Sequence, residues 1–132
     1  MTNQSATIAI VDDHAVMRKG MTFRLKTVGF NVIMEAENGK QFLDQLKNGT
    51  VPDVCILDIN MPVMNGFETL KRLKAEFPEM RVIFFSMNDD KTYIDKAMEM
   101  GADAYVTKDA PVTEMDRVLA QVCAGKRMGV AV

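Results

Sequence analysis

The most constraining feature of this sequence is a regular alternation between short apolar runs and segments with helical periodicity. The apolar runs are nearly continuous, as strands buried on both faces require. Strictly alternating strands and helices make right-handed crossovers, which produce a parallel sheet covered on both faces. The sequence therefore predicts one doubly wound α/β domain with five parallel strands. The expected strands are residues 7–11, 31–35, 54–57, 81–85 and 104–106.

Between and after these strands, apolar residues recur at helical spacing and predict five helices. At the start of the last helix, Thr113 and Asp116 have the spacing of a capping box. The expected second to fourth helices are residues 41–48, 66–77 and 91–100, whereas the first and last helices include residues 17–28 and 115–122, respectively.

Composition narrows the class of protein. The 132 residues suit one domain, and 48% hydrophobic with 26% charged residues is typical of a folded globular chain. The net charge of −2 lacks the basic footprint of a nucleic-acid binder, so no direct nucleic-acid binding by this chain is expected. Cys55 and Cys123 suggest neither a disulfide framework nor a metal knuckle. The sequence shows no export signal and no apolar run long enough to span a membrane. A cytoplasmic protein that does not bind membranes is therefore expected.

Polar residues follow four of the expected strands. Ligands of doubly wound sheets bind beyond the carboxyl ends of the strands, so these side chains are expected to converge. Three neighbouring carboxylates repel one another unless a cation is present, and oxygen ligands with room for water suit Mg²⁺ or Mn²⁺. A carboxylate held beside such a metal and a lysine can attack a phosphoryl group and form an aspartyl phosphate. The residues are Asp12, Asp13, Asp58, Ser86 and Lys108.

Each of these residues has a simpler explanation when it is taken alone. Asp12 and Asp13 could cap a helix, Lys108 could be a solvated surface residue, and Ser86 could belong to a turn. No packing rule places three acids, a hydroxyl and an amine at one edge, so their joint placement favours function. For His14 we favour a place in the first turn of a helix near the site over a role as phosphohistidine or metal ligand.

Four motifs at the strand ends make the chain similar to the receiver domains of two-component response regulators. They are IVDDH at 10–14, LDINMPVMNG at 57–66, FFSMND at 84–89 and AYVTKDA at 104–110. The segments VDDHAVMRKGM and TKDAP most resemble the NarL/FixJ subfamily. The resemblance implies a flavodoxin-like (βα)5 fold with strand order 2-1-3-4-5. It also implies a receiver domain at residues 1–124, with 125–132 as a tail or the start of a linker to an output domain outside this chain.

The resemblance also implies a role for each matching residue. Asp58 would be the phosphoacceptor, and Lys108 would contact the phosphoryl oxygens. Asp13 would bind Mg²⁺ directly and Asp12 indirectly, and Asn60 would offer its backbone carbonyl to the metal. Asn60 and Asn88 match positions that tune loss of the phosphoryl group.

A switch is implied at Ser86 and Tyr105. Ser86 would hydrogen-bond the phosphoryl group, and Tyr105 would turn inward behind it, changing the face made by the fourth helix, fifth strand and fifth helix. One departure concerns Asp109, which stands where many receivers have a proline after a cis peptide bond. A cis bond without proline costs about 2.5 to 4 kcal/mol, so the sequence leaves this loop's geometry open.

The implied function is a signalling switch that catalyses its own phosphotransfer and autodephosphorylation without being an enzyme for a separate substrate. Its partners would be a sensor histidine kinase or phosphotransfer protein, with a homodimer expected on phosphorylation and transcription controlled through a DNA-binding domain. The alternatives are a stand-alone regulator and an interaction module of this fold that is regulated without phosphorylation. A haloacid-dehalogenase-type phosphatase is disfavoured because its second aspartate, two residues after the nucleophile, is here Asn60, which cannot transfer a proton.

Overall fold

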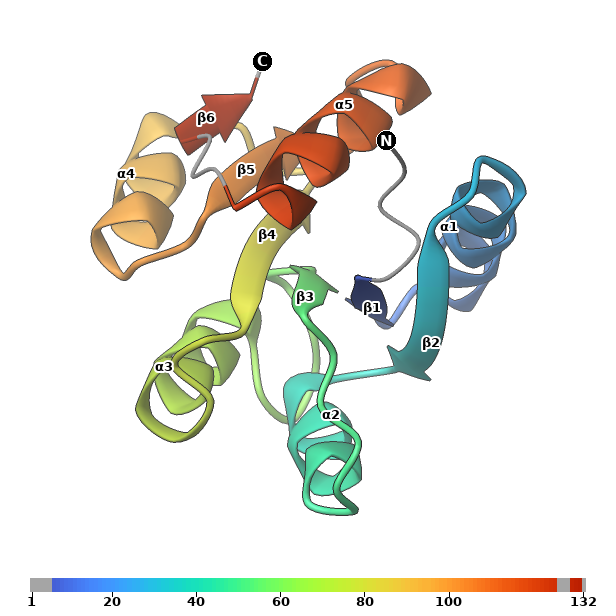
Figure 1. Ribbon diagram of the computed structural model, residues 1–132. Coiled ribbons are helices and arrows are strands. Elements are labelled where there is room, and N and C mark those ends of the chain that lie inside the picture. The colour runs from blue at the N-terminus through green and yellow to red at the C-terminus, as the bar shows by residue number, and fades with distance from the viewer. Residues whose placement is uncertain (1–5, 126–128, 132) are drawn as a thin grey trace.

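The computed structural model describes residues 6–125 and 129–131 as one alternating series of strands and helices (Figure 1). The strands are β1 (Thr7–Val11), β2 (Asn31–Ala36), β3 (Val54–Leu57), β4 (Arg81–Ser86), β5 (Ala104–Thr107) and β6 (Gly129–Ala131). The helices are α1 (Ala15–Thr27), α2 (Gly39–Leu46), α3 (Gly66–Glu76), α4 (Lys91–Glu99) and α5 (Val112–Cys123). Within the described ranges, no helix has both the length and the apolar character needed to cross a membrane.

All neighbouring strands are parallel, and the sheet order is β2-β1-β3-β4-β5-β6. The predicted five strands and their order 2-1-3-4-5 are confirmed. The sixth strand was not predicted. It pairs Gly129–Ala131 with Ala104–Val106 of β5, inside the segment 125–132 for which a tail or linker was expected. A run this short carries no detectable period, so only its pairing with β5 identifies it as a strand.

Helices cover both faces of the sheet, as the buried apolar strands require (Figure 1). On one face, side chains of α1 and α5 such as Leu25 and Leu119 pack against Ile10 and Ile56. On the other face, α2, α3 and α4 pack against the alternate strand residues, including Val11 and Leu57. Adjacent strand residues thus serve opposite cores, which is why the apolar runs are continuous.

Side-chain caps set the start of three helices. Asn38 accepts the N–H of Gln41 at the start of α2, and Asp90 accepts the N–H of Thr92 at the start of α4. Asn65 forms a reciprocal capping box with Glu68 at the start of α3.

The capping box predicted at Thr113 and Asp116 is wrong. The last helix begins at Val112 with Pro111 as its N-cap, so Thr113 already lies within the first turn. Asp116 instead forms an ion pair with Arg24 of α1, a contact between distant segments that local spacing cannot reveal.

The strand register aligns the carboxyl ends of the central strands. Val11 pairs with Leu57, and Leu57 pairs with Phe84. The ladder continues beyond β3, because the N–H of Asp58 donates to the Val11 carbonyl at 2.9 Å. The N–H of Lys108 likewise donates to the Ser86 carbonyl at 2.8 Å. These bonds fix the backbone of the residues that follow the strands.

Candidate functional site

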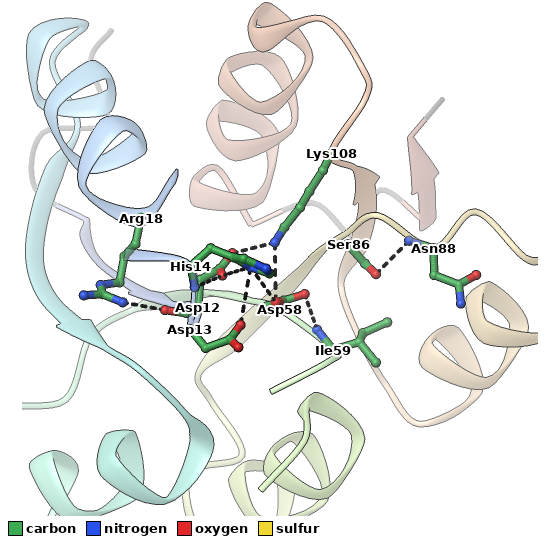
Figure 2. Close-up of polar contacts among 9 residues, drawn as sticks. All are labelled: Asp12, Asp13, His14, Arg18, Asp58, Ile59, Ser86, Asn88 and Lys108. Atoms are coloured by element: carbon green, nitrogen blue, oxygen red, sulfur yellow. Dashed lines mark hydrogen bonds and ion pairs between the residues drawn. The ribbon is translucent and has the colours of Figure 1, made fainter. Parts of the chain in front are cut away.

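The side chains of Asp12, Asp58 and Lys108 meet beyond the carboxyl ends of β1, β3 and β5 (Figure 2). The Lys108 Nζ lies 2.7 Å from Asp12 Oδ2 and 3.4 Å from Asp58 Oδ2. Its side chain is only 1% exposed, so Lys108 is a buried cation between two buried carboxylates and not a solvated surface lysine. The sequence-predicted convergence of these three residues is present.

Asp58 is buried, and its two carboxylate oxygens differ. Oδ1 accepts the N–H of Ile59 at 2.8 Å. Oδ2 makes no hydrogen bond among the described residues and has only two longer contacts, with the Lys108 Nζ at 3.4 Å and the His14 Nδ1 at 3.9 Å. Burial, followed by the neighbouring Asp12 carboxylate, raises the pKa of Asp58 to about 6, against the opposing effects of Lys108 and the Ile59 N–H. Asp58 therefore presents a poorly compensated oxygen that is ionised at neutral pH.

Asp13 completes an acidic pocket together with Asp12, His14 and Asp58. One ligand atom from each of these four residues lies within 4.8 Å of the others. Asp13 is partly exposed, which gives the pocket an open side. Carboxylate oxygens with access to water, one of them buried without a hydrogen bond, fit the donor set that Mg²⁺ and Mn²⁺ prefer.

His14 lies at the N-cap of α1, and its ring reaches into the acidic pocket (Figure 2). Its Nδ1 lies 3.0 Å from Asp12 Oδ1, 3.4 Å from Asp13 Oδ1 and 3.9 Å from Asp58 Oδ2. The backbone N–H of His14 also donates to Asp12 Oδ1 at 2.8 Å. The favoured interpretation from sequence placed His14 in the first turn of a helix near the site. His14 is instead the N-cap, one residue before α1 begins at Ala15, and its contacts with the carboxylates were not anticipated.

Two residues that support the pocket, Arg18 and Glu35, were not identified as site residues from the sequence. The buried Arg18 donates from Nη1 to the Asp12 carbonyl at 2.6 Å and from Nε to Glu35 Oε1 at 2.9 Å. Arg18 thereby ties the end of β1 to β2. The available signal was its position one helical turn after His14, which places it on the side of α1 nearest the strand ends.

Ser86 and Tyr105 are both fully buried and are joined through Asn88. The Ser86 Oγ accepts the backbone N–H of Asn88 at 3.0 Å. The Tyr105 hydroxyl donates to the Asn88 carbonyl at 2.6 Å. The loop between β4 and α4 is thus held from both sides, and Tyr105 points inward in this structure.

The remaining predicted positions flank the pocket. Asn60 is exposed two residues beyond Asp58, and the peptide bond between Lys108 and Asp109 is trans. In the loop after Asn60, Val63 has φ of 70°, a left-handed conformation that is strained for a β-branched residue. The chain therefore leaves the pocket through a constrained loop before it enters α3.

The response regulator receiver domain family matches residues 8–120. This chain belongs to that family. The receiver domain is 36% identical over 128 residues to the nitrate/nitrite response regulator protein NarL of Escherichia coli K12. The match covers 96% of this chain and 59% of that protein, so the chain spans about three fifths of this relative's length. The predicted similarity to NarL-type regulators is confirmed, and members of this family are signalling proteins and not classical enzymes.

Solved structures support the same assignment. The signal receiver domain named NarL from Mycobacterium tuberculosis superimposes with a TM-score of 0.84 at 27% identity, over 93% of this chain and 99% of that one. A chain of the CheX–CheY complex of Borrelia burgdorferi, solved with BeF3⁻ and magnesium, gives a TM-score of 0.83 at 26% identity. That match covers 89% of this chain and 88% of the other.

The raised pKa of Asp58 predicts how stability depends on pH when the receiver domain is free of metal. Between about pH 4 and pH 6 the folded state holds a proton that the unfolded state has lost, so the free energy of unfolding falls as pH rises through this window. Asp58→Asn removes this effect. After allowance for solvent screening, we expect the variant to be more stable than the parent by about 1 to 2 kcal/mol at pH 8, with little difference at pH 4.

Urea denaturation in the presence of a chelator at pH 4, 6 and 8 measures this difference. Other carboxyl groups also titrate in this range, so the quantity to compare is the gap between the parent and Asp58→Asn at each pH. An equal gap at pH 4 and pH 8 would contradict the prediction, because it would show that the charge of Asp58 is not its source.

Proposed function

We propose that this receiver domain is a phosphorylation-activated switch that accepts a phosphoryl group on Asp58. The donor would be a sensor histidine kinase or a phosphotransfer protein. The observation that carries the proposal is Asp58 Oδ2, a buried carboxylate oxygen without a hydrogen bond that faces Lys108 on one side and the acidic pocket on the other. Such an oxygen is an available nucleophile, and Lys108 together with a dication in the acidic pocket would offset the negative charge of an incoming phosphoryl group.

A divalent metal would be held by Asp13 and Asp58 directly, by the Asn60 carbonyl, and by Asp12 indirectly. When bound, Mg²⁺ or Mn²⁺ neutralises charge on phosphoryl oxygens. The carboxylate cluster supports this assignment, as does the neighbouring structure that contains magnesium.

The protein groups divide the chemistry between them. Asp58 Oδ2 forms the new bond to phosphorus while the bond from phosphorus to the donor breaks. The Ile59 N–H holds Oδ1 and so orients Oδ2 toward the pocket. Lys108, already 3.4 Å from Oδ2, is placed to contact a phosphoryl oxygen and stabilise its charge.

Transmission would begin at Ser86. Its Oγ now accepts the Asn88 N–H, and we propose that a phosphoryl group on Asp58 draws the hydroxyl into a new hydrogen bond. Because Tyr105 holds the carbonyl of the same Asn88, this exchange would reset the loop between β4 and α4. The change would reach the face formed by α4, β5 and α5.

The output would be transcription, controlled through a DNA-binding domain outside this chain. One similar protein, 33% identical over 103 residues, is the transcriptional regulatory protein DegU of Brevibacillus brevis. The homodimer expected on phosphorylation stays a prediction. A doubled mass in size-exclusion chromatography with light scattering would support it, and an unchanged mass would contradict it.

Intact mass spectrometry after incubation with acetyl phosphate tests the proposed function. We expect one phosphoryl adduct that requires both Mg²⁺ and Asp58, so chelator or Asp58→Asn should abolish it. Asp44→Asn is the matched control, because Asp44 is an exposed carboxylate on α2 that pairs only with Lys40 among the described contacts. This variant should be labelled like the parent.

A missing adduct in the parent, under conditions that label a reference receiver, would overturn the proposal. An interaction module regulated without phosphorylation would then be the better description. An adduct that persists in Asp58→Asn would instead place the phosphoacceptor elsewhere.

A further inference from the structure

We propose that His14 is a metal ligand and that, through it, the acidic pocket binds borderline first-row dications such as Zn²⁺ and Co²⁺ in preference to Mg²⁺. The inference concerns the same pocket as the proposed function and goes beyond it, since it adds a nitrogen donor and a metal class. It starts from the position of Nδ1, which approaches a carboxylate oxygen of each of Asp12, Asp13 and Asp58 (Figure 2).

The distances suit ligands that share one ion. Ligand bonds of about 2.1 Å place neighbouring donor atoms about 3.0 Å apart in an octahedral site and about 3.4 Å apart in a tetrahedral one. The His14 Nδ1 lies 3.0, 3.4 and 3.9 Å from the three carboxylate oxygens. Of the three His14 contacts, only the one to Asp58 must shorten, and the exposed His14 side chain has room to move. All four ligand atoms lie within 4.8 Å of one another.

The charges of the pocket favour a dication. Asp12, Asp13 and Asp58 carry three negative charges when ionised, whereas the only cation in ion-pair contact with Asp12 and Asp58, apart from His14, is Lys108 in the described part of the chain. Arg18 is engaged by Glu35 and by the Asp12 backbone carbonyl. Two negative charges therefore stay uncompensated, and the unbonded Asp58 Oδ2 is an independent sign that the pocket lacks a partner.

The donor set decides between metals. Carboxylates alone suit Mg²⁺, which retains several waters, whereas imidazole favours zinc-class ions. Three carboxylate oxygens and one imidazole nitrogen supply four protein ligands, the number that fills a tetrahedral zinc site. A zinc-class ion held in this way would occupy Asp58 Oδ2 and compete with Mg²⁺.

The backbone presents the ring to the pocket. The His14 N–H donates to Asp12 Oδ1, which fixes the start of α1 beside the carboxylates. The side chain makes no capping hydrogen bond to the helix, so its removal does not remove a cap. At 60% exposure, the ring also stands where an ion from solvent would reach it.

Calorimetric titration of the tag-free receiver domain with Zn²⁺ and with Mg²⁺ measures the preference. We expect Zn²⁺ to bind more tightly, and His14→Ala to reduce the ratio of the Mg²⁺ Kd to the Zn²⁺ Kd by at least about 10- to 100-fold. Cys123→Ser is the control for thiolate binding, because Cys123 is the less buried of the two cysteines. This variant should keep the ratio of the parent.

A second readout uses the fact that His14 is the only histidine of the chain. In ¹H–¹⁵N correlation spectra of the imidazole, Zn²⁺ should shift the Nδ1 resonance of this single ring at one equivalent of metal. Unperturbed ring nitrogens at saturating Zn²⁺, or an unchanged Kd ratio in His14→Ala, would overturn the inference.

These outcomes are separable from those of phosphorylation. If acetyl phosphate labels Asp58 but the His14 ring does not respond to Zn²⁺, the metal inference alone fails. If Zn²⁺ shifts the ring while Asp58 is never labelled, the proposed phosphorylation fails and the metal inference is supported.

Discussion

Gly66→Ala is expected to destabilise the receiver domain by about 3 kcal/mol or more. A Cβ at Gly66 would lie 2.4 Å from the Asp58 carbonyl oxygen and 2.7 Å from the Ile59 Cα, and both of these are backbone atoms. The Phe84 ring lies 3.0 Å away on a third side. The Gly66 N–H also donates to the Ile59 carbonyl at 2.7 Å, so α3 cannot withdraw without loss of this bond. The added methyl must therefore displace the start of α3 or the backbone of Asp58.

Urea denaturation followed by circular dichroism measures the loss. Gly20→Ala is the matched control, because Gly20 lies in α1 and an added Cβ there would contact nothing within 4 Å. That variant should gain about 0.5 to 1 kcal/mol from its better helix propensity. If the free energy of unfolding of Gly66→Ala stays within about 1 kcal/mol of the parental value, the close approach of α3 to Asp58 is not tight in solution.

Much of this architecture follows from the order of residue types along the chain. Continuous apolar runs that alternate with helical patterns leave few topologies other than a parallel sheet with helices on both faces. In such a sheet the residue after each strand must lie at one edge. The meeting of Asp12, Asp58 and Lys108 could therefore be predicted before any coordinates were known.

The features that were missed depend on contacts between distant segments. Arg18 joins the Asp12 carbonyl to Glu35, and no local spacing encodes a bond from α1 to β2. Asp116 was interpreted through its neighbour Thr113, whereas its partner in the structure is Arg24, far away in sequence. Local rules favoured a helix cap because they consider only a few adjacent residues.

His14 shows a different limit. The sequence pattern placed it near a helix start, one residue away from its actual position as the N-cap, but the direction of its ring depends on the turn between β1 and α1. The backbone N–H of His14 donates a hydrogen bond to Asp12 Oδ1 at 2.8 Å, which holds His14 beside the carboxylates. The sequence predicted the carboxylates of the pocket. That the His14 Nδ1 lies beside them is visible only in the structure.

Lys108→Met is expected to slow the labelling of Asp58 by acetyl phosphate about 10²- to 10³-fold, the usual effect of removing one stabilising group from a developing oxyanion. Methionine is a long apolar side chain that can fill the same buried space without a charge. Asp12 would lose its 2.7 Å partner and Asp58 its 3.4 Å partner. Breaking a buried ion pair in this way costs about 3 to 5 kcal/mol, so the metal-free variant should also be less stable.

The two effects respond differently to metal. Bound Mg²⁺ would compensate the negative charge of Asp12 and Asp58, which lose their partner in this variant, and would restore part of the stability. It would not replace the Lys108 contact with the phosphoryl group. We therefore expect Mg²⁺ to raise the free energy of unfolding of Lys108→Met more than that of the parent, while the labelling rate stays low. Lys91→Met is the matched control, since the exposed Lys91 pairs with Asp95 at 2.7 Å on α4 and its loss should leave both the stability and the labelling rate close to those of the parent. Labelling of Lys108→Met at the parental rate would remove Lys108 from the proposed chemistry and leave it as a structural counter-ion for Asp12.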